Sequence, residues 1–268
     1  MTSPILELRD VVTKVNRNTP EELTLLKGLN LTINEGDFVT VLGSNGAGKS
    51  TLFNTIAGNL SIDSGDILLR GKSIANESEE RRTRFLSRVF QDPKLGTAPR
   101  MTVAENLLLA AKRGQGRHLV PRGLRKSLPH FKEITATMNN GLDHRLSTPT
   151  GNLSGGQRQA LSFLMATLKR PDILLLDEHT AALDPKTSQE LMKTTNDRIT
   201  EEDLTCLMIT HHLDDALKYG NRLIVIDNGR SPLMLLGRRK RALLRRSFIV
   251  SLVIWMGREW RKTVGSGV

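Results

Sequence analysis

The sequence predicts an α/β protein, and two segments carry this prediction. A short apolar strand, Asp37–Leu42, runs directly into the glycine-rich segment Gly43–Thr51, after which a helix begins. Further along, four consecutive aliphatic residues, Ile173–Leu176, predict a buried strand that ends in two carboxylates, Asp177 and Glu178. A chain that alternates strands with helices and places polar groups at the strand ends is typical of an α/β fold with its site at those ends.

The composition fits a globular protein with an almost neutral body. The chain has 268 residues, of which 38% are hydrophobic and 25% charged, and its formal net charge is +11. Gly229–Val268 carries ten Lys or Arg and one acid, which leaves 29 basic and 27 acidic side chains for the other 228 residues. Because the positive charge is concentrated in this stretch, the sequence does not support nucleic-acid binding by the chain as a whole.

Cysteine use and hydropathy restrict where the chain can work. The one cysteine, Cys206, cannot form an intrachain disulfide and favours a reducing compartment, and we expect a small buried side chain there. Met1–Asp10 shows no signal-peptide pattern. The longest uncharged apolar run, Ser247–Gly257, is far shorter than the ~20 residues that span a bilayer, so any membrane channel is expected to be another chain.

The other strands are predicted from short apolar or alternating runs. Ile5–Val12 and Leu23–Ile33 form a hairpin-like pair around a polar loop. Further strands are predicted at Asp66–Arg70, at a short segment ending with Val89 and Phe90, at Leu204–Thr210 and at Arg222–Ile226.

The segment Gly43–Thr51 matches the phosphate-loop pattern, in which Gly, four residues and Gly-Lys-Ser lie between a strand and a helix. Glycines let consecutive backbone N–H groups approach phosphate oxygens, and the helix N-terminus adds a partial positive charge. Lys49 is expected to reach the outer phosphates, and the Ser50 hydroxyl to ligate Mg²⁺. The predicted phosphate-binding residues are Gly43, Ser44, Asn45, Gly46, Ala47, Gly48, Lys49, Ser50 and Thr51.

From about Leu95 to Asn152 the pattern predicts helices, at Val103–Lys112 and Leu124–Asn139. The linker between these helices is basic. It is either a solvated surface or a face that meets a membrane protein or anionic lipid, and both interpretations stay open. Its basic residues are Arg113, Arg117, Arg122, Arg125 and Lys126.

A second anion-binding helix N-terminus is predicted at Leu153–Gln157, which precedes an apolar-periodic helix at Gln159–Leu168. Ser154 is expected to be the N-cap, and the two glycines that follow leave backbone N–H groups exposed. A nucleotide held between the two sites of different copies would join two chains.

Acidic, amide and imidazole side chains follow the later strands. Asp177 is expected to serve Mg²⁺, through water, and Glu178 to polarise an attacking water. Gln91 is a candidate only by its place between the phosphate loop and the later motifs. For His211 and His212, a zinc site lacks further ligands nearby in the sequence, so a hydrogen bond from His211 to a γ-phosphate is favoured.

These motifs, in this order, resemble the nucleotide-binding subunit of an ATP-binding cassette (ABC) transporter. The resemblance covers roughly Ile5 to Arg230 and rests on six motifs: Gly43–Thr51, Gln91, Leu153–Gln157, Ile173–Glu178, Ala182–Pro185 and His211.

The resemblance implies a role for each site residue. Lys49 and the loop backbone would hold the β- and γ-phosphates of ATP, and Glu178 would be the general base. Ser50, Gln91 and Asp177 would serve Mg²⁺, and His211 would contact the γ-phosphate. The segment that meets the other subunit's nucleotide would comprise Ser154, Gly155, Gly156 and Gln157, with Asp184 at the dimer interface.

The resemblance also implies an architecture and partners. The expected fold is a P-loop NTPase α/β core with an N-terminal antiparallel β subdomain and an inserted α-helical subdomain at about 95–152. Residues 1–230 would form the ATPase domain and residues 231–268 an atypical basic tail. A second ATPase subunit, membrane permease subunits and a substrate-binding protein are the implied partners, at the cytoplasmic face of the membrane, with no nucleic acid.

Three features depart from the family pattern. Met1–Asp37 lacks the aromatic residue that usually stacks on adenine, and Val15 or Asn16 takes its place. His179 stands where Pro is commoner. The tail Ser231–Val268 is Arg-rich and almost free of acids. It is either a natural lipid-binding segment or the product of an altered reading frame, and we favour the altered reading frame.

Two function classes remain open. The segments Asp177–Pro185, Gln91–Pro93 and Gly96–Pro99 are similar to a little-characterised bacterial importer branch associated with amino-acid-like substrates. The alternative is a soluble mechanical ATPase that acts on ribosomes or DNA. Ribosome-associated relatives usually carry two cassettes, and DNA-repair relatives a long coiled coil after the position of Gln91, so this single short cassette favours transport.

Overall fold

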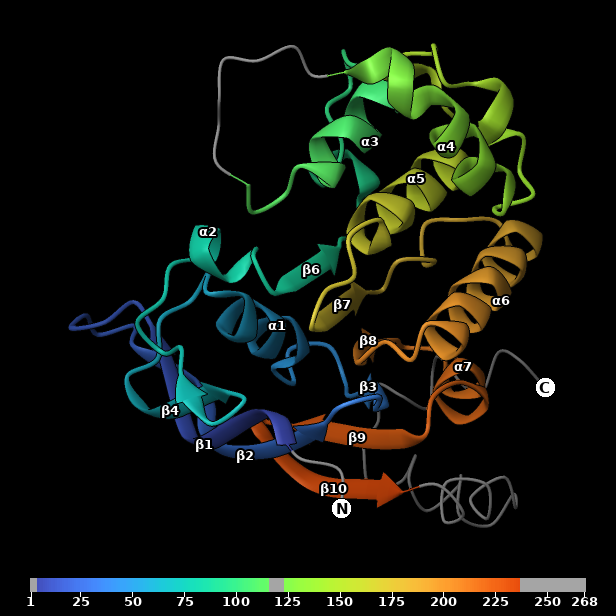
Figure 1. Cartoon of the computed structure of the whole chain (residues 1–268). Helices are drawn as coiled ribbons and strands as arrows, with labels where there is room; N and C mark the ends of the chain where they lie inside the picture. The colour runs from blue at the N-terminus through green and yellow to red at the C-terminus, as the bar shows by residue number, and fades with distance from the viewer. Residues whose placement is uncertain (1–3, 116–122, 237–268) are drawn as a thin grey trace. The chain divides into compact units, whose positions relative to one another are not determined.

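A computed structural model of the chain describes residues 4–115 and 123–236 (Figure 1). The chain forms two compact units. The first contains residues 1–79 and 205–268, and the second contains residues 80–204. The phosphate loop and the acidic strand end therefore belong to different units.

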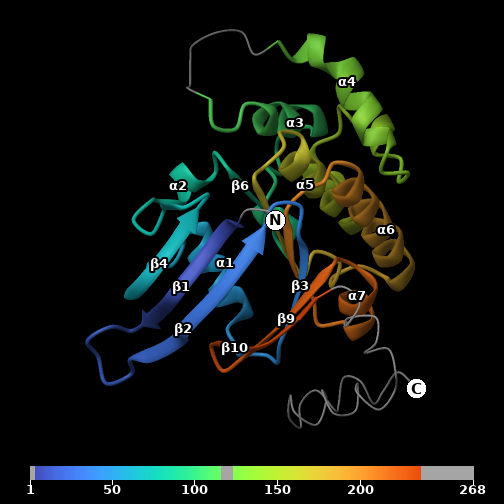
Figure 2. The ribbon, with the colours of Figure 1, turned by 60° about the horizontal axis from the view of Figure 1, so that its bottom comes forward.

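The first unit contains an antiparallel sheet of four strands in the order β2-β1-β4-β5 (Figure 2). The predicted hairpin-like pair is confirmed, since β1 and β2 pair antiparallel over most of their length. Alternate residues of both strands are buried, as expected for a sheet with one face on a core. The strands are β1 (Pro4–Val15), β2 (Leu23–Asn34), β4 (Ser64–Leu69) and β5 (Lys72–Ser73).

The same unit holds the strand that leads into the phosphate loop. Strand β3 (Phe38–Leu42) is buried throughout and pairs in parallel with β8 (Cys206–Ile209) and β9 (Arg222–Asp227). A parallel strand with both faces covered is expected to be apolar along its length, which explains the sequence of β3. Strand β10 (Arg230–Leu236) pairs antiparallel with β9 and lies beyond the last strand predicted from the sequence. Helices α1 (Lys49–Ala57) and α7 (Leu213–Lys218) complete this unit.

A buried polar cluster fixes the start of β3. The Asp37 carboxylate accepts hydrogen bonds from the Asn34 N–H at 2.8 Å and the Asn221 side chain at 3.0 Å, and it pairs with Arg222. Asp37 and Arg222 are 7% and 5% exposed, so removal of either would leave a buried charge without compensation. The cluster therefore holds the strand that carries the phosphate loop against β9.

The second unit combines two parallel strands with helices. Strands β6 (Leu86–Val89) and β7 (Ile173–Asp177) pair residue by residue, from Leu86 opposite Ile173 to Val89 opposite Leu176. The α3, α4 and α5 helices lie together (Figure 1) and correspond to the helices predicted at Val103–Lys112, Leu124–Asn139 and Gln159–Leu168. The helices are α3 (Val103–Ala111), α4 (Leu124–Ala136), α5 (Gly155–Thr167) and α6 (Pro185–Glu201). Three 3₁₀ turns are η1 (Pro93–Leu95), η2 (Leu142–His144) and η3 (Thr150–Asn152). The short helix α2 (Glu79–Arg82) lies at the boundary of the two units.

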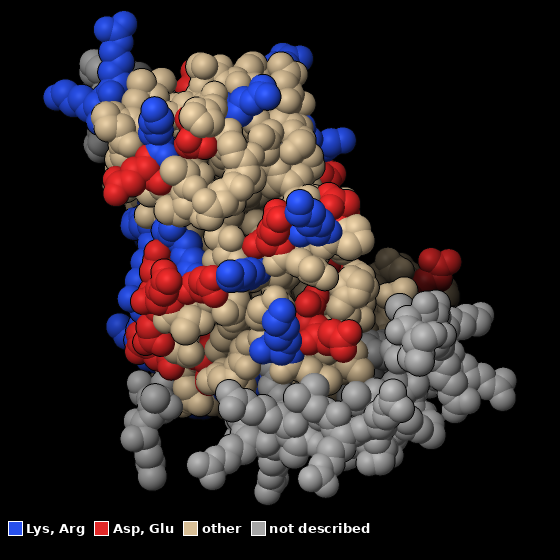
Figure 3. Space-filling view, turned by 90° about the vertical axis from the view of Figure 1, so that its right-hand side faces the viewer, with Lys and Arg blue, Asp and Glu red and all other residues tan. Residues whose placement is uncertain are grey.

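Several expectations concern residues outside the described ranges. These are Arg117 and Arg122 of the basic linker, the apolar run Ser247–Gly257 and the tail from residue 237 onward. Within the described ranges no helix is both long and apolar enough to cross a membrane. On the face shown in Figure 3, basic and acidic side chains are interspersed, in line with the near-neutral charge calculated for the body of the chain.

Candidate functional site

The phosphate loop connects β3 to α1 and adopts a conformation that requires glycine at two points. A Cβ atom on Gly43 would lie 2.5 Å from the Ile226 carbonyl oxygen of β9. Gly48 is the N-cap of α1 and has φ 108°, a value that side-chain-bearing residues rarely adopt. Ile226 and β9 thus form a wall behind the loop, and glycine allows the backbone to lie against that wall.

Lys49 is the first residue of α1 and its side chain folds back over the loop. Its Nζ donates hydrogen bonds to the carbonyl oxygens of Gly43 at 2.8 Å and Ser44 at 3.0 Å, and the residue is 7% exposed. A buried ammonium group is stable only where acceptors surround it. The loop therefore places a fixed positive charge among backbone amides, an arrangement that suits phosphate oxygens.

A turn between β9 and β10 braces the loop from outside the motif. The Gly229 N–H donates to the Ala47 carbonyl oxygen at 2.9 Å, and the Lys27 N–H donates to the Gly229 carbonyl oxygen at 2.9 Å. A Cβ atom on Gly229 would lie 2.1 Å from the Leu25 carbonyl oxygen, so only glycine fits. This contact links the loop to β2 across about 180 residues of sequence, and sequence reasoning did not identify it.

In the second unit, β7 ends as predicted at Asp177, with Glu178 directly after it. An Asp177 carboxylate oxygen, Oδ2, accepts a hydrogen bond from Arg88 Nη2 of β6 at 2.5 Å. Glu178 has φ 46°, a left-handed conformation that turns the chain sharply after the strand. Adjacent carboxylates at a strand end point in different directions, so the two can serve different tasks.

His179 is buried next to these carboxylates. It is 2% exposed, and its Nε2 shares a hydrogen bond of 3.4 Å with the Thr195 hydroxyl of α6. Burial lowers the pKa of His179 from 6.5 to about 4, because a charged imidazole would lose its hydration there. The residue that departs from the family pattern is therefore a neutral packing group that joins the end of β7 to α6.

The N-terminus of α5 carries its own cap. The Ser154 hydroxyl accepts from the Gln157 N–H at 3.2 Å, and the Gln157 side chain accepts in return from the Ser154 N–H at 3.3 Å. These reciprocal bonds form a capping box. The predicted N-cap at Ser154 is confirmed, and the helix includes Gly155 and Gly156 in its first turn.

Arg158 organises the loop that precedes this cap. Its guanidinium donates to the carbonyl oxygens of Thr150 at 3.0 Å, Gly151 at 2.8 Å and Leu153 at 3.2 Å. Three carbonyl groups that point at one cation fix the backbone leading into Ser154. Sequence reasoning did not identify this role of Arg158.

The remaining predicted residues lie at loop and helix ends. Asp184 caps α6 by accepting from the Thr187 N–H at 3.1 Å, and hydrogen bonds from Thr187 lower its pKa. Gln91 follows β6. The carbonyl oxygen of the preceding residue, Phe90, accepts a hydrogen bond of 3.0 Å from the buried Gln159 side chain. The predicted opening of a helix at Ala182–Pro185 is confirmed.

His211 and His212 lie between β8 and α7, and His212 is the N-cap of α7. Their ring centroids lie 4.4 Å apart. Within residues 4–115 and 123–236, no group of three or more His, Cys, Asp or Glu side chains is placed to hold a metal ion. His211 belongs to the same unit as the phosphate loop, whereas Gln91, Asp177 and Glu178 belong to the other.

Comparisons with known proteins identify the family of this chain. Residues 26–181, more than half of the chain, match the family model described as ABC transporter. This chain belongs to the ABC transporter family. The fold and the ATPase activity predicted from the motifs are those of the family, and the chain is the ATP-binding subunit of an ABC transporter.

Individual relatives of this cassette are ATP-binding proteins of transport systems. The chain is 46% identical to the tyrosine transport ATP-binding protein of Clostridioides difficile, over 78% of this chain and 83% of that protein. It is 34% identical to the bicarbonate transport ATP-binding protein CmpD of a Synechocystis species, over 81% and 73% of the two chains.

Solved structures confirm the cassette fold. A dimeric post-hydrolysis state of the ATP-binding cassette MJ0796, bound to ADP and Pi, matches with a TM-score of 0.74 and 26% identity, over 87% of this chain and 99% of that one. The cbiO1 protein from Clostridium perfringens, part of the ABC transporter complex cbiONQ, matches with a TM-score of 0.73 and 28% identity, over 93% and 94%.

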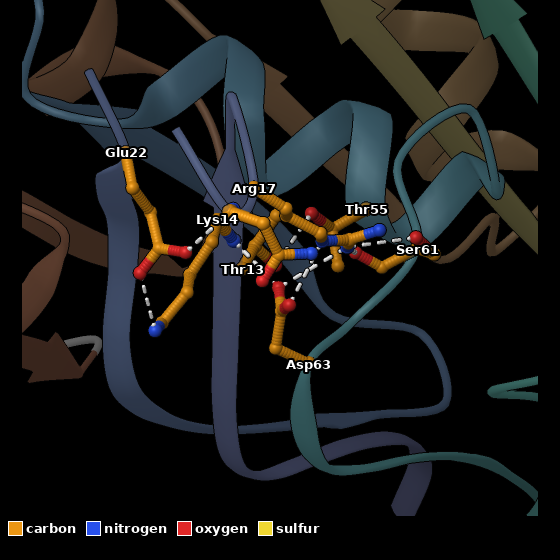
Figure 4. A network of polar contacts seen from close by, with 8 residues as sticks. Thr13, Lys14, Arg17, Glu22, Thr55, Ser61 and Asp63 are labelled. Carbon is orange, nitrogen blue, oxygen red and sulfur yellow. Dashed lines mark hydrogen bonds and ion pairs between the residues drawn. The ribbon is translucent and has the colours of Figure 1, made fainter. Parts of the chain in front are cut away.

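A polar network lies around the loop after β1, the segment expected to take the place of the adenine-stacking aromatic residue (Figure 4). Strand β1 ends at Val15, and Asn16 begins the loop with φ 52°. The next residue, Arg17, forms an ion pair of 2.8 Å with Asp63 and donates to the Ser61 carbonyl oxygen at 3.1 Å. This loop is thus fixed by the contacts of the Arg17 guanidinium.

Proposed function

We propose that this ABC cassette binds ATP with Mg²⁺, dimerises around it and drives import of an amino-acid-like solute through separate permease subunits. The observation that carries the ATP-binding part is the buried Lys49, whose amine is held by the loop's own carbonyl oxygens at the N-terminus of α1. A glycine-built loop with a buried lysine has little other use than to bind phosphate groups.

The residues of the chain divide the work of hydrolysis. Lys49 and the loop amides bind the β- and γ-phosphates, and His211 contacts the γ-phosphate. Glu178 accepts a proton from the attacking water, a new oxygen–phosphorus bond forms at the γ-phosphate, and the bond to the β-phosphate oxygen breaks to leave ADP and phosphate.

Ser50, Gln91 and Asp177 supply the oxygen ligands and hydrogen bonds that suit Mg²⁺. A magnesium ion held by these residues would neutralise charge that develops on the phosphate oxygens. Each residue has chemistry that would suit the ion: Asp177 is a carboxylate at the end of a buried strand, and Ser50 is a hydroxyl in the first turn of α1.

The second subunit contributes the segment from Ser154 to Gln157 and the interface residue Asp184. The dimeric state of MJ0796 supports a dimer here. The tyrosine transport relative supports an amino-acid-like substrate, and permease subunits with a substrate-binding protein complete the proposed importer.

Light scattering on purified Glu178→Gln protein tests this proposal. With Mg-ATP the variant is expected to change from monomer to dimer, while turnover falls by about 10²–10⁴. Glu190→Gln, the same change at an exposed position of α6, is the control and is expected to keep wild-type turnover. Normal turnover by Glu178→Gln contradicts the base assignment, and bound ATP without dimers contradicts the shared site.

The substrate class is tested in cells. Uptake of labelled tyrosine and of labelled lysine is compared between cells of the source organism with the unaltered chain and cells with Glu178→Gln. A loss of tyrosine uptake alone supports an importer for aromatic amino acids, and equal uptake in both strains contradicts it.

A further inference from the structure

Arg88 lies directly beside the proposed magnesium residue, and no motif of the family calls for it there. In the parallel pair of β6 and β7, Arg88 is opposite Leu175, and its side chain reaches two residues further along β7 to Asp177. The side chains of Arg88 and Asp177 are 12% and 14% exposed. The contact is therefore partly shielded from water, where a charge-assisted hydrogen bond is stronger than at an exposed site.

Arg88 is itself held in one orientation. Its guanidinium carbon lies 4.9 Å from the centre of the Phe90 ring, a distance at which a cation is attracted by an aromatic face. The Phe90 backbone is fixed in turn by the hydrogen bond from Gln159 of α5. The guanidinium is thus aimed at Asp177 from a defined direction.

The contact uses one oxygen of the carboxylate. Arg88 binds Oδ2, and Arg88 is the one side chain in the described part of the chain that bonds or ion-pairs with Asp177. A carboxylate with one oxygen fixed in this way presents the other in a defined direction. Carboxylates that serve a metal are commonly oriented by such a neighbouring hydrogen bond, and its loss typically costs 10–100-fold in metal affinity.

We propose that Arg88 is a positioning residue for the magnesium site, which fixes Asp177 so that its other oxygen meets the hydration shell of the ion. This inference rests on the proposed role of Asp177. A purely structural ion pair between β6 and β7 is the alternative, and it predicts altered stability with an unaltered response to Mg²⁺.

Titration of Mg²⁺ against a fixed concentration of a fluorescent ATP analogue distinguishes the two. Fluorescence anisotropy of the analogue on the full chain reports nucleotide binding without turnover. For Arg88→Met we expect the half-saturating Mg²⁺ concentration to rise by about tenfold. Binding of the analogue in EDTA is expected to change by less than about twofold, because the phosphate loop is intact.

Two further variants test whether the shift is specific to the Arg88 guanidinium. Arg88→Lys keeps the charge but not the planar fork, so an intermediate shift is expected, and Arg88→Lys also serves if the Met variant does not fold. Arg198→Met removes an arginine from the i,i+4 ion pair with Glu202 on α6, and no shift is expected.

Asp177→Asn separates the two proposals. If Asp177→Asn leaves the Mg²⁺ titration unchanged, the assignment of Asp177 itself is wrong. If Asp177→Asn shifts the titration but both Arg88 variants leave it unchanged or lower the half-saturating concentration, the positioning role of Arg88 is overturned. Support requires that Arg88→Met shifts the titration in the wild-type background and adds nothing to Asp177→Asn.

Discussion

The N-termini of α1 and α5 are both proposed to meet phosphate groups, yet the chain builds them differently. Helix α1 begins after Gly48, which has no side chain with which to cap the helix. Helix α5 begins at a capping box, in which Ser154 and Gln157 bond to each other's backbone N–H groups. The first N-terminus is open to an external acceptor, and the second already has an internal one.

This difference suggests an order of events. A phosphate group at α1 would compete with no side chain of the helix cap, and it would meet Lys49 in the same turn. A phosphate group at α5 would meet the N–H groups of Gly155 and Gly156, but it would find the Gln157 N–H already bonded to the Ser154 hydroxyl. A single chain is therefore expected to bind its nucleotide at α1 first, and α5 is expected to join only when a second subunit brings a nucleotide to it.

The largest effect is expected at the open N-terminus. Lys49→Ala removes a charged donor that would make two hydrogen bonds to phosphate, each worth about 1.5–3 kcal/mol. Nucleotide affinity of the isolated chain is expected to fall by about a hundredfold, equivalent to about 3 kcal/mol. Isothermal titration calorimetry checks this value. An affinity within threefold of wild type contradicts the comparison, because it places the main phosphate contacts elsewhere.

Acid is expected to destabilise the unit that contains α5, through protonation of His179. The neutral imidazole of His179 is favoured in the folded chain, where its pKa is about 4, against 6.5 when unfolded. Its contribution to stability is complete above pH 6.5 and is lost as the pH falls from 6.5 towards 4. Between pH 7 and pH 5 the loss is about 2 kcal/mol.

Urea denaturation at pH 7, 6 and 5 measures this effect. His179→Gln cannot take up the proton, so its free energy of unfolding is expected to change less with pH than that of the wild type. His130→Gln, at an exposed position of α4, is the control and keeps the wild-type slope. Equal slopes for His179→Gln and the wild type contradict a buried neutral imidazole.

Local sequence patterns predicted both helix N-termini and much of the fold. The phosphate loop and the end of β7 each lie within a few residues of an apolar strand, so spacing alone located them. The pattern of Ser154 and Gln157, three residues apart before an apolar run, also contained the capping box, of which only the N-cap was predicted.

Local sequence patterns could not predict the long-range contacts that hold these segments in place. Arg88 and Asp177 are 89 residues apart in sequence, and no local pattern links an arginine in one strand to a carboxylate in another. Gly229 bonds to Ala47 and lies against Leu25 because the turn between β9 and β10 places it there. Such partners depend on strand order and register, which a single sequence leaves open.

The smallest effect is expected at the α5 cap, where two variants separate the contribution of Ser154 to stability from its proposed contact with a nucleotide. Ser154→Ala removes the cap and is expected to lower the free energy of unfolding by about 1 kcal/mol. Thr102→Ala removes an equivalent capping box, with Glu105, at the start of α3 in the same unit, and is expected to cost about as much. In the Glu178→Gln background, light scattering is expected to show weaker ATP-driven dimerisation for Ser154→Ala only, while both variants keep wild-type nucleotide affinity as monomers. Equal dimerisation of the two capping variants would mean that Ser154 serves its own helix alone, and that the two N-termini differ in function as well as in structure.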